Sequence, residues 1–268
     1  MGGFYKAPKK RHLEALVEDL KWGVDAAEKT ARWAAELPFP DFEQDYEFVS
    51  LSHPDEYPMN EGRIISNRGL DIAIGEYEDH FEEQHATYTN ALQSVLKERG
   101  NYLVGPMARF SLNFDRLTER AQSVARECGL DGGCRNPFQS IVVRAIELIY
   151  AYEEALRVIE QYEPPEKPAF EVNPAGGHGC GLTEAPRGSL FHRYDIDDEG
   201  LIASAKIVPP TSQNQLTIEN DLREFVPQYL DLPDDKLQWH CEQAIRNYDP
   251  CISCATHFLK LERKELDS

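Results

Sequence analysis

The chain has 268 residues, of which 41% are hydrophobic, and a formal net charge of −19. This length allows one sizeable core or two small ones, and the acidic excess argues against nucleic acid or an anionic membrane surface as a partner. Six cysteines are too few for a disulfide scaffold at this length. No apolar run reaches the roughly 18 residues of a membrane span, and the N-terminus lacks the apolar stretch of a secretory signal. We therefore expect a cytoplasmic protein without a membrane span.

The first part of the chain is predicted to be mainly helical. Apolar residues at spacings of three and four indicate helices over residues 11–36, 110–128 and 137–162. Gly105 and Pro106 are predicted to interrupt the regular structure of the chain before the second of these helices. Short apolar runs punctuated by glycine within residues 46–76 predict a small antiparallel sheet.

Two groups of possible metal ligands in this part favour other interpretations. Residues 78–91 hold an acidic and histidine cluster, which is more typical of a solvated face near a helix start than of a site for a hard cation. Cys128 and Cys134 flank a glycine-rich turn without further ligands, so we interpret them as structural or incidental thiols.

The proline-rich segment over residues 163–168 predicts a stiff, extended linker. It divides the chain into a helical region, residues 1–162, and a second region, residues 163–268. The glycine-rich residues 175–181 follow it and are predicted to be a flexible loop near a site. His178 and Cys180 in this loop lack further ligands.

A β-hairpin is predicted over residues 189–194 and 201–208, with a turn rich in aspartate between them. Its two ends would bring Arg187 and Thr211 to the same edge. A last helix, over about residues 235–247, is predicted to deliver the segment that follows it.

That segment is Asp249-Pro250-Cys251-Ile252-Ser253-Cys254-Ala255-Thr256-His257. Thiolates are soft ligands suited to nickel, iron, copper or zinc, and Pro250 disfavours helix at Asp249, so the cysteines are presented from a turn. A single C-x-x-C motif leaves half a zinc site, a redox dithiol and a cluster ligand pair open. The sequence holds no second C-x-x-C motif that would complete a zinc site.

Three blocks together resemble a known family. The motif Asp-Pro-Cys-x-x-Cys-x-x-His near the end of the chain is preceded by Glu184-Ala185-Pro186-Arg187-Gly188 and by Val208-Pro209-Pro210-Thr211-Ser212-Gln213-Asn214. In order and spacing they resemble the large, catalytic subunit of [NiFe] hydrogenases, in the cytoplasmic NAD(P)-linked or sulfur-reducing branch. The resemblance implies a mainly α fold with small β elements, built on the helical-bundle core of that subunit, and an enzyme that oxidises H2 or reduces protons.

The resemblance also implies roles for individual residues. Cys251 would be a terminal nickel ligand, and Cys254 would bridge nickel to an iron that carries CO and two cyanides and would relay the proton. Arg187 would hang over the metals with Pro186 beside it and Asp249 flanking it. An arginine suits this place because its guanidinium is always charged and offers five donors.

Further expectations concern ligands and partners. Thr211 or Ser212 would bind a cyanide nitrogen, and His257 would bind Mg2+ or Fe2+ and mark the cut made by a maturation endopeptidase. The implied partners are an iron–sulfur small subunit, diaphorase-type electron-transfer subunits and nickel-insertion proteins.

The sequence departs from the family pattern in its first cysteine pair, in the glutamate that relays protons and in the acidic partner of the C-terminal magnesium. The family's first C-x-x-C pair is absent, so we expect the C-terminal part of a large subunit, truncated at the N-terminus and inactive alone. Truncation would also leave apolar helix faces exposed. The alternatives are a metal-free structural or assembly module of the same fold and a small zinc-binding regulator.

Overall fold

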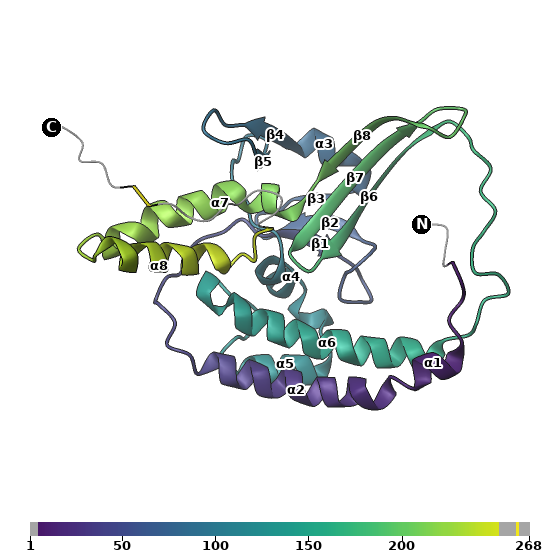
Figure 1. Ribbon diagram of the computed structural model, residues 1–268, viewed down its shortest axis with the longest axis horizontal. Helices are drawn as coiled ribbons and strands as arrows, with labels where there is room; N and C mark the ends of the chain where they lie inside the picture. Colours follow the sequence, from purple (N-terminus) through teal and green to yellow (C-terminus); the bar gives the residue numbers. More distant parts are fainter. Residues whose placement is uncertain (1–4, 252–260, 263–268) are drawn as a thin grey trace.

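The computed structural model describes residues 5–251 and 261–262, so Cys254 and His257 lie outside the described residues. Within the described part the protein is built from helices and three small sheets (Figure 1). The helices are α1 (Lys10–Glu14), α2 (Val17–Ala35), α3 (Tyr77–His80), α4 (Pro106–Asn113), α5 (Glu119–Glu127), α6 (Ser140–Gln161), α7 (Pro210–Phe225) and α8 (Asp234–Arg246). None of them has the length and apolar character needed to cross a membrane. These helices confirm the mainly helical character that the sequence predicted.

The long helices α2 and α6 pack along each other (Figure 1). Small residues on α2 allow this close approach: Gly23, Ala27 and Ala31 are buried. A Cβ at Gly23 would lie 2.9 Å from the ring of Tyr152 on α6. The largest apolar cluster of the protein forms where α2, α4, α5 and α6 meet.

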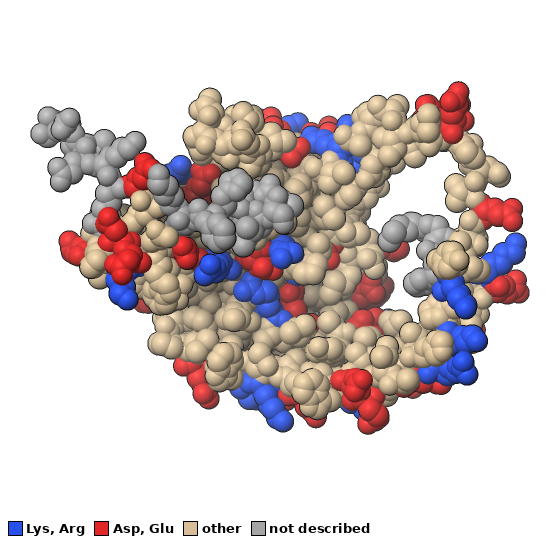
Figure 2. All heavy atoms as spheres, in the orientation of Figure 1, with Lys and Arg blue, Asp and Glu red and all other residues tan. Residues whose placement is uncertain are grey.

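The strands form three antiparallel sheets, ordered β1-β2-β3, β4-β5 and β6-β7-β8. The strands are β1 (Val49–Ser52), β2 (Arg63–Ser66), β3 (Asp71–Ile72), β4 (Phe81–His85), β5 (Leu92–Leu96), β6 (Gly177–Ala185), β7 (Gly188–Ile196) and β8 (Ile202–Val208). The first sheet confirms the one predicted within residues 46–76. The third sheet projects as an arm, and the space-filling view shows an opening between this arm and the helices (Figure 2).

Four local predictions were wrong. Residues 177–185 form β6 rather than a flexible loop, because each of these residues pairs with β7, from Gly177 opposite Ile196 to Ala185 opposite Gly188. Pro106 does not break the chain but starts α4, since a proline at the first helical position loses no intrahelical hydrogen bond. The predicted helix over residues 11–36 is divided at residues 15–16 into α1 and α2. The predicted helix over residues 110–128 is divided as well, because residues 114–118 separate α4 from α5.

The second half of the chain shares its apolar clusters with the first. Ile218 of α7 lies in the cluster of α2 and α6, while Leu182, Phe191 and Val208 of the arm lie in a cluster with Leu51 of β1. Helix α7 packs against β5 and β7, and α8 packs against α7. This packing brings the end of α8, the start of α7 and the β6–β7 turn together.

One helix face remains exposed. Ile141, Leu148 and Val158 on α6 are 40%, 47% and 50% exposed. Their spacing places them on one side of the helix, opposite the buried Val142, Ile146 and Ile149. These three side chains form apolar surface on α6 within the described residues.

Candidate metal centre

The turn that bears Cys251, here called the cysteine turn, follows α8 directly. Asp249 adopts φ +48°, in the left-handed region that aspartate tolerates better than most residues. The Asp249 N–H donates to the carbonyl of Arg246 at 3.0 Å, which closes the end of the helix. Pro250 then prevents the helix from continuing. Cys251 is consequently presented from the turn, partly buried, as the sequence predicted.

Arg187 reaches this turn from the opposite side. It lies between β6 and β7, and its Nε donates to the carbonyl of Asp249 at 2.7 Å and lies 3.3 Å from Asp249 Oδ2. Both side chains are about half exposed, 46% and 48%. An exposed pair contributes at most about 1 kcal/mol to stability, so its main effect is to hold a guanidinium beside the cysteine turn.

The backbone behind Arg187 is closely packed. Gly188 has φ +138°, and a Cβ there would lie 2.5 Å from Cγ2 of Val104. Gly105 has φ +109°, and a Cβ there would lie 2.6 Å from the carbonyl oxygen of Arg187. Glycine at both places lets the turn between β6 and β7 that bears Arg187, the arginine turn, rest directly on the start of α4.

The start of α7 forms the third side of the site. Cys251 N–H donates to Thr211 Oγ1 at 3.2 Å, whereas the hydroxyl of Ser212 donates to the carbonyl of Pro209 at 3.0 Å. Both residues are buried in the first turn of α7. Of the two, Thr211 therefore has its hydroxyl at the cysteine turn. Unpaired N–H groups and the helix dipole make this end of α7 favourable for anionic ligands.

A buried ion network, which the sequence did not reveal, supports the arginine turn. Arg109 of α4 binds Glu147 of α6 with two bonds of 2.9 Å and Glu184 of β6 at 3.0 Å. The same guanidinium donates to the carbonyls of Ala185 at 2.7 Å and Pro186 at 3.1 Å. Burial would lower the pKa of Arg109, but the carboxylates of Glu147 and Glu184 raise it above its ordinary value. The network thus fixes the two residues that precede Arg187.

A hollow of about 500 Å³ adjoins this network and the cysteine turn. Its wall includes Leu148 and Ala151 of α6, together with Pro186, Asp249 and Arg144. Arg144 also donates to the carbonyl of Asn247 at 3.1 Å, and burial lowers its pKa. The hollow therefore joins an apolar wall to the cationic edge of the site.

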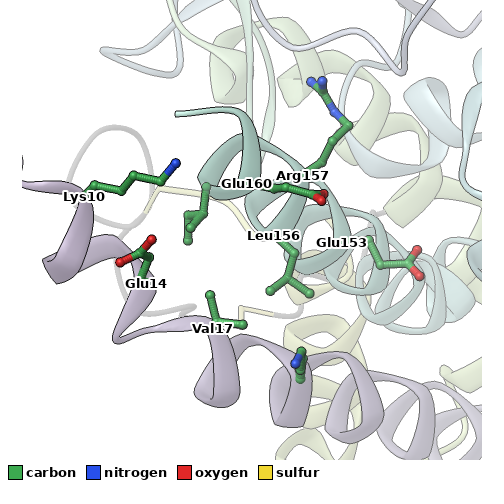
Figure 3. A pocket seen from close by; sticks show the side chains of 9 residues that line it. Lys10, Glu14, Val17, Glu153, Leu156, Arg157 and Glu160 are labelled. Atoms are coloured by element: carbon green, nitrogen blue, oxygen red, sulfur yellow. The ribbon is translucent and has the colours of Figure 1, made fainter. Parts of the chain in front are cut away.

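Another hollow, of about 670 Å³, lies elsewhere. It is formed by α1, α2 and α6, and its labelled side chains include Lys10, Glu14 and Arg157 (Figure 3). Basic and acidic groups are mixed around it, and none of its lining residues is one of those around Cys251. It does not contribute to the candidate centre.

Among the described residues, the thiol of Cys251 is the group that the sequence predicted as a nickel ligand. Within residues 5–251 and 261–262, no group of three or more histidine, cysteine or acidic side chains could hold a metal. Cys251 is the predicted ligand among them, and Arg187 and the start of α7 surround its turn with positive charge. A soft thiolate in such surroundings suits a soft metal with anionic ligands. Cys254 and His257 cannot be placed against it.

The carboxylate of Asp221, near the turn that bears Cys251, lies in a buried environment. Asp221 of α7 is buried and accepts hydrogen bonds from the hydroxyls of Tyr46 and Tyr248. Burial raises the pKa of Asp221 from 3.8 to about 6, with Glu224 adding to the rise, while the bonds from Tyr248 and Tyr46 oppose it.

Asp221 should make stability depend on pH. Because its folded pKa is raised, its contribution is fully present below pH 3.8 and is lost as pH rises through about 6. We expect the free energy of unfolding of the wild type, relative to Asp221→Asn, to fall by about 1–3 kcal/mol between pH 4 and 7. Urea unfolding of both proteins at several pH values measures this difference. A difference that stays constant or rises with pH would contradict the assignment.

Known proteins resemble this chain in sequence. Residues 101–257, more than half of the chain, match the family model of the nickel-dependent hydrogenases. The chain belongs to the nickel-dependent hydrogenase family. Sulfhydrogenase 1 subunit alpha of Pyrococcus furiosus is 29% identical over 97% of this chain and 61% of its own length. The NAD-reducing hydrogenase HoxS subunit beta of Cupriavidus necator is 30% identical over 69% of this chain and 40% of its own.

Solved structures show the same fold for this hydrogenase-family chain. The crystal structure of an NAD+-reducing [NiFe]-hydrogenase in the H2-reduced state superimposes with a TM-score of 0.76 and 25% identity, covering 96% of this chain and 62% of that one. A [NiFeSe] hydrogenase from Desulfovibrio vulgaris Hildenborough gives a TM-score of 0.70 at 20% identity, which shows the fold alone. The chain spans about three fifths of the length of these proteins.

Proposed function

We propose that this chain forms part of the catalytic subunit of a [NiFe] hydrogenase, which oxidises H2 and reduces protons reversibly. The observation that carries the proposal is the contact of Arg187 with Asp249, two residues before Cys251. Family membership supports the same reaction class. The helices around α2 and α6 would belong to the helical-bundle core of that subunit, and the linker at residues 163–168 would separate its two regions.

The proposed centre takes Cys251 and Cys254 as two of its thiolates. When bound, a nickel–iron group with CO and cyanide ligands supplies the heterolytic splitting of H2. The sulfur of Cys254 holds the released proton. Arg187 and the start of α7 stabilise negative charge near the centre, Thr211 offers its hydroxyl there, and His257 would bind Mg2+ or Fe2+.

The electrons would pass to an iron–sulfur small subunit and then to a diaphorase-type subunit, in a cytoplasmic complex. The relatives' names support a multisubunit enzyme, since one is a subunit alpha and another a subunit beta. Nickel-insertion proteins and an endopeptidase that cuts after His257 would mature the subunit.

A metal-free assembly module of the same fold is the second candidate, because the sequence contains a single C-x-x-C pair. Nickel and iron analysis of the assembled complex separates the two. A complex that assembles without nickel and without hydrogenase activity would favour the module.

The role of Arg187 can be tested with Arg187→Lys in the assembled complex. Lysine keeps the charge but replaces the planar guanidinium by a single ammonium, which cannot reproduce the Nε contact with Asp249. We expect kcat for H2-dependent dye reduction to fall by about 100-fold with nickel content unchanged. Arg63→Lys is a matched control, since Arg63 forms an exposed pair with Asp71 on the first sheet. Full activity of Arg187→Lys would refute the proposed role.

A further inference from the structure

The segment that leads into Cys251 is held by several parts of the protein. The carbonyl of Asn247 accepts from Ser140 Oγ at 2.6 Å and from Arg144 at 3.1 Å, both on α6. Arg187 holds the carbonyl of Asp249, and Cys251 N–H reaches Thr211. Between these contacts lies Tyr248, whose side chain turns inward and is 8% exposed.

We propose that Tyr46, Asp221 and Tyr248 form a latch that positions the backbone of Cys251. This inference deepens the proposed function. Its consequence for metal binding, that the Cys251 thiolate is held in place, rests on that function. Tyr248 is then a positioning residue for the cysteine rather than a group that touches the reacting atoms.

The geometry of the latch joins three separate parts of the chain. Tyr46 precedes β1, Asp221 lies on α7 and Tyr248 follows α8; the three side chains are 5%, 7% and 8% exposed. Both phenols donate to Oδ2 of Asp221, and the two phenol oxygens are 3.1 Å apart. Hydrogen bonds to an ionised, buried acceptor are among the stronger ones in proteins. The start of the cysteine segment is therefore bonded to α7 in a dry environment.

Helix α7 holds both ends of the segment formed by residues 248–251. Asp221 binds Tyr248 at the start, and Thr211 accepts from the Cys251 amide at the end. The bond at Thr211 is 3.2 Å long and joins uncharged groups, so it is the weaker of the two anchors. Loss of the latch should then release the Cys251 amide, although α8 itself stays folded. A ligand has to be held within about 0.5 Å of its productive place, so such release would matter for metal binding.

The test is amide hydrogen exchange in the full chain purified without nickel. In Tyr248→Phe the carboxylate of Asp221 keeps its bond from Tyr46, so the substitution removes the latch without leaving a buried charge unpaired. We expect exchange at the Cys251 amide to become about tenfold faster, while amides in the middle of α8, such as that of Cys241, keep their rates. Tyr88→Phe is the matched control: it removes the phenol–carboxylate bond of 2.7 Å between the exposed Tyr88 and Glu219 of α7. Its Cys251 exchange should equal that of the wild type.

Substitution of the acceptor gives an independent readout. Asp221→Asn keeps an oxygen that accepts from the phenols and should retain most of the protection at Cys251, whereas Asp221→Leu should lose it. Unchanged exchange at Cys251 in both Tyr248→Phe and Asp221→Leu would overturn the proposal. An equal acceleration throughout α8 would also overturn it, because it would show ordinary helix docking. The exchange rates do not depend on hydrogenase activity, so the latch and the proposed function can fail separately.

Discussion

Replacing Cys251 with serine is expected to reduce the nickel content of the assembled complex by at least about 100-fold. Serine is close in size but offers a hard hydroxyl in place of a soft thiolate, and nickel in a sulfur-rich site depends on thiolates. We expect the turn to remain intact, because the bonds made by the Asp249 carbonyl, the Tyr248 phenol and the Cys251 amide do not involve the sulfur. Loss of nickel would therefore report the ligand itself.

Nickel per subunit, measured by elemental mass spectrometry, checks this expectation. Cys180→Ser is the control, because Cys180 is exposed on β6 and belongs to the arm rather than to the cysteine turn. It should leave nickel unchanged. A Cys251→Ser complex that retains wild-type nickel would remove Cys251 from the centre and, with it, the basis of the proposed chemistry.

Replacing Arg109 with methionine is expected to lower the free energy of unfolding by about 3–5 kcal/mol. The guanidinium is 3% exposed and neutralises Glu184, which is buried, and Glu147, which is 12% exposed, so its removal leaves two carboxylates without their cation. The carbonyls of Ala185 and Pro186 would lose their donor as well. The arginine turn should therefore loosen even in the molecules that remain folded.

Urea unfolding with extrapolation to water measures the loss. Arg120→Met is the matched control, since Arg120 binds Glu28 and Asp25 but is 42% exposed, and its loss should cost at most about 1 kcal/mol. Adding Glu147→Gln and Glu184→Gln to Arg109→Met should recover part of the stability, because the uncompensated charges are then removed. The network would not have the proposed importance if Arg109→Met were no more destabilising than Arg120→Met.

Local features of the chain follow from the order of its residues. The apolar spacing of α6 and the strands β7 and β8 depend on neighbouring residues, and so do the turn imposed by Pro250 and the thiol spacing of the cysteine motif. These features have short-range causes, namely periodicity, turn chemistry and ligand type. The three motif blocks, read as short runs of sequence, were therefore enough to indicate the family.

Which distant residues support the site depends instead on tertiary packing. Glycine has a low strand propensity, so β6 formed against its local preference because β7 satisfied its backbone. Arg109 lies 38 residues from Glu147 and 75 from Glu184, and Asp221 lies 175 residues from Tyr46. Such pairs leave no periodic signal in the chain, because their contact depends on how whole elements pack. Which hydroxyl lies at the cysteine turn is also a matter of packing: Thr211 accepts from the Cys251 amide, whereas Ser212 donates to the carbonyl of Pro209.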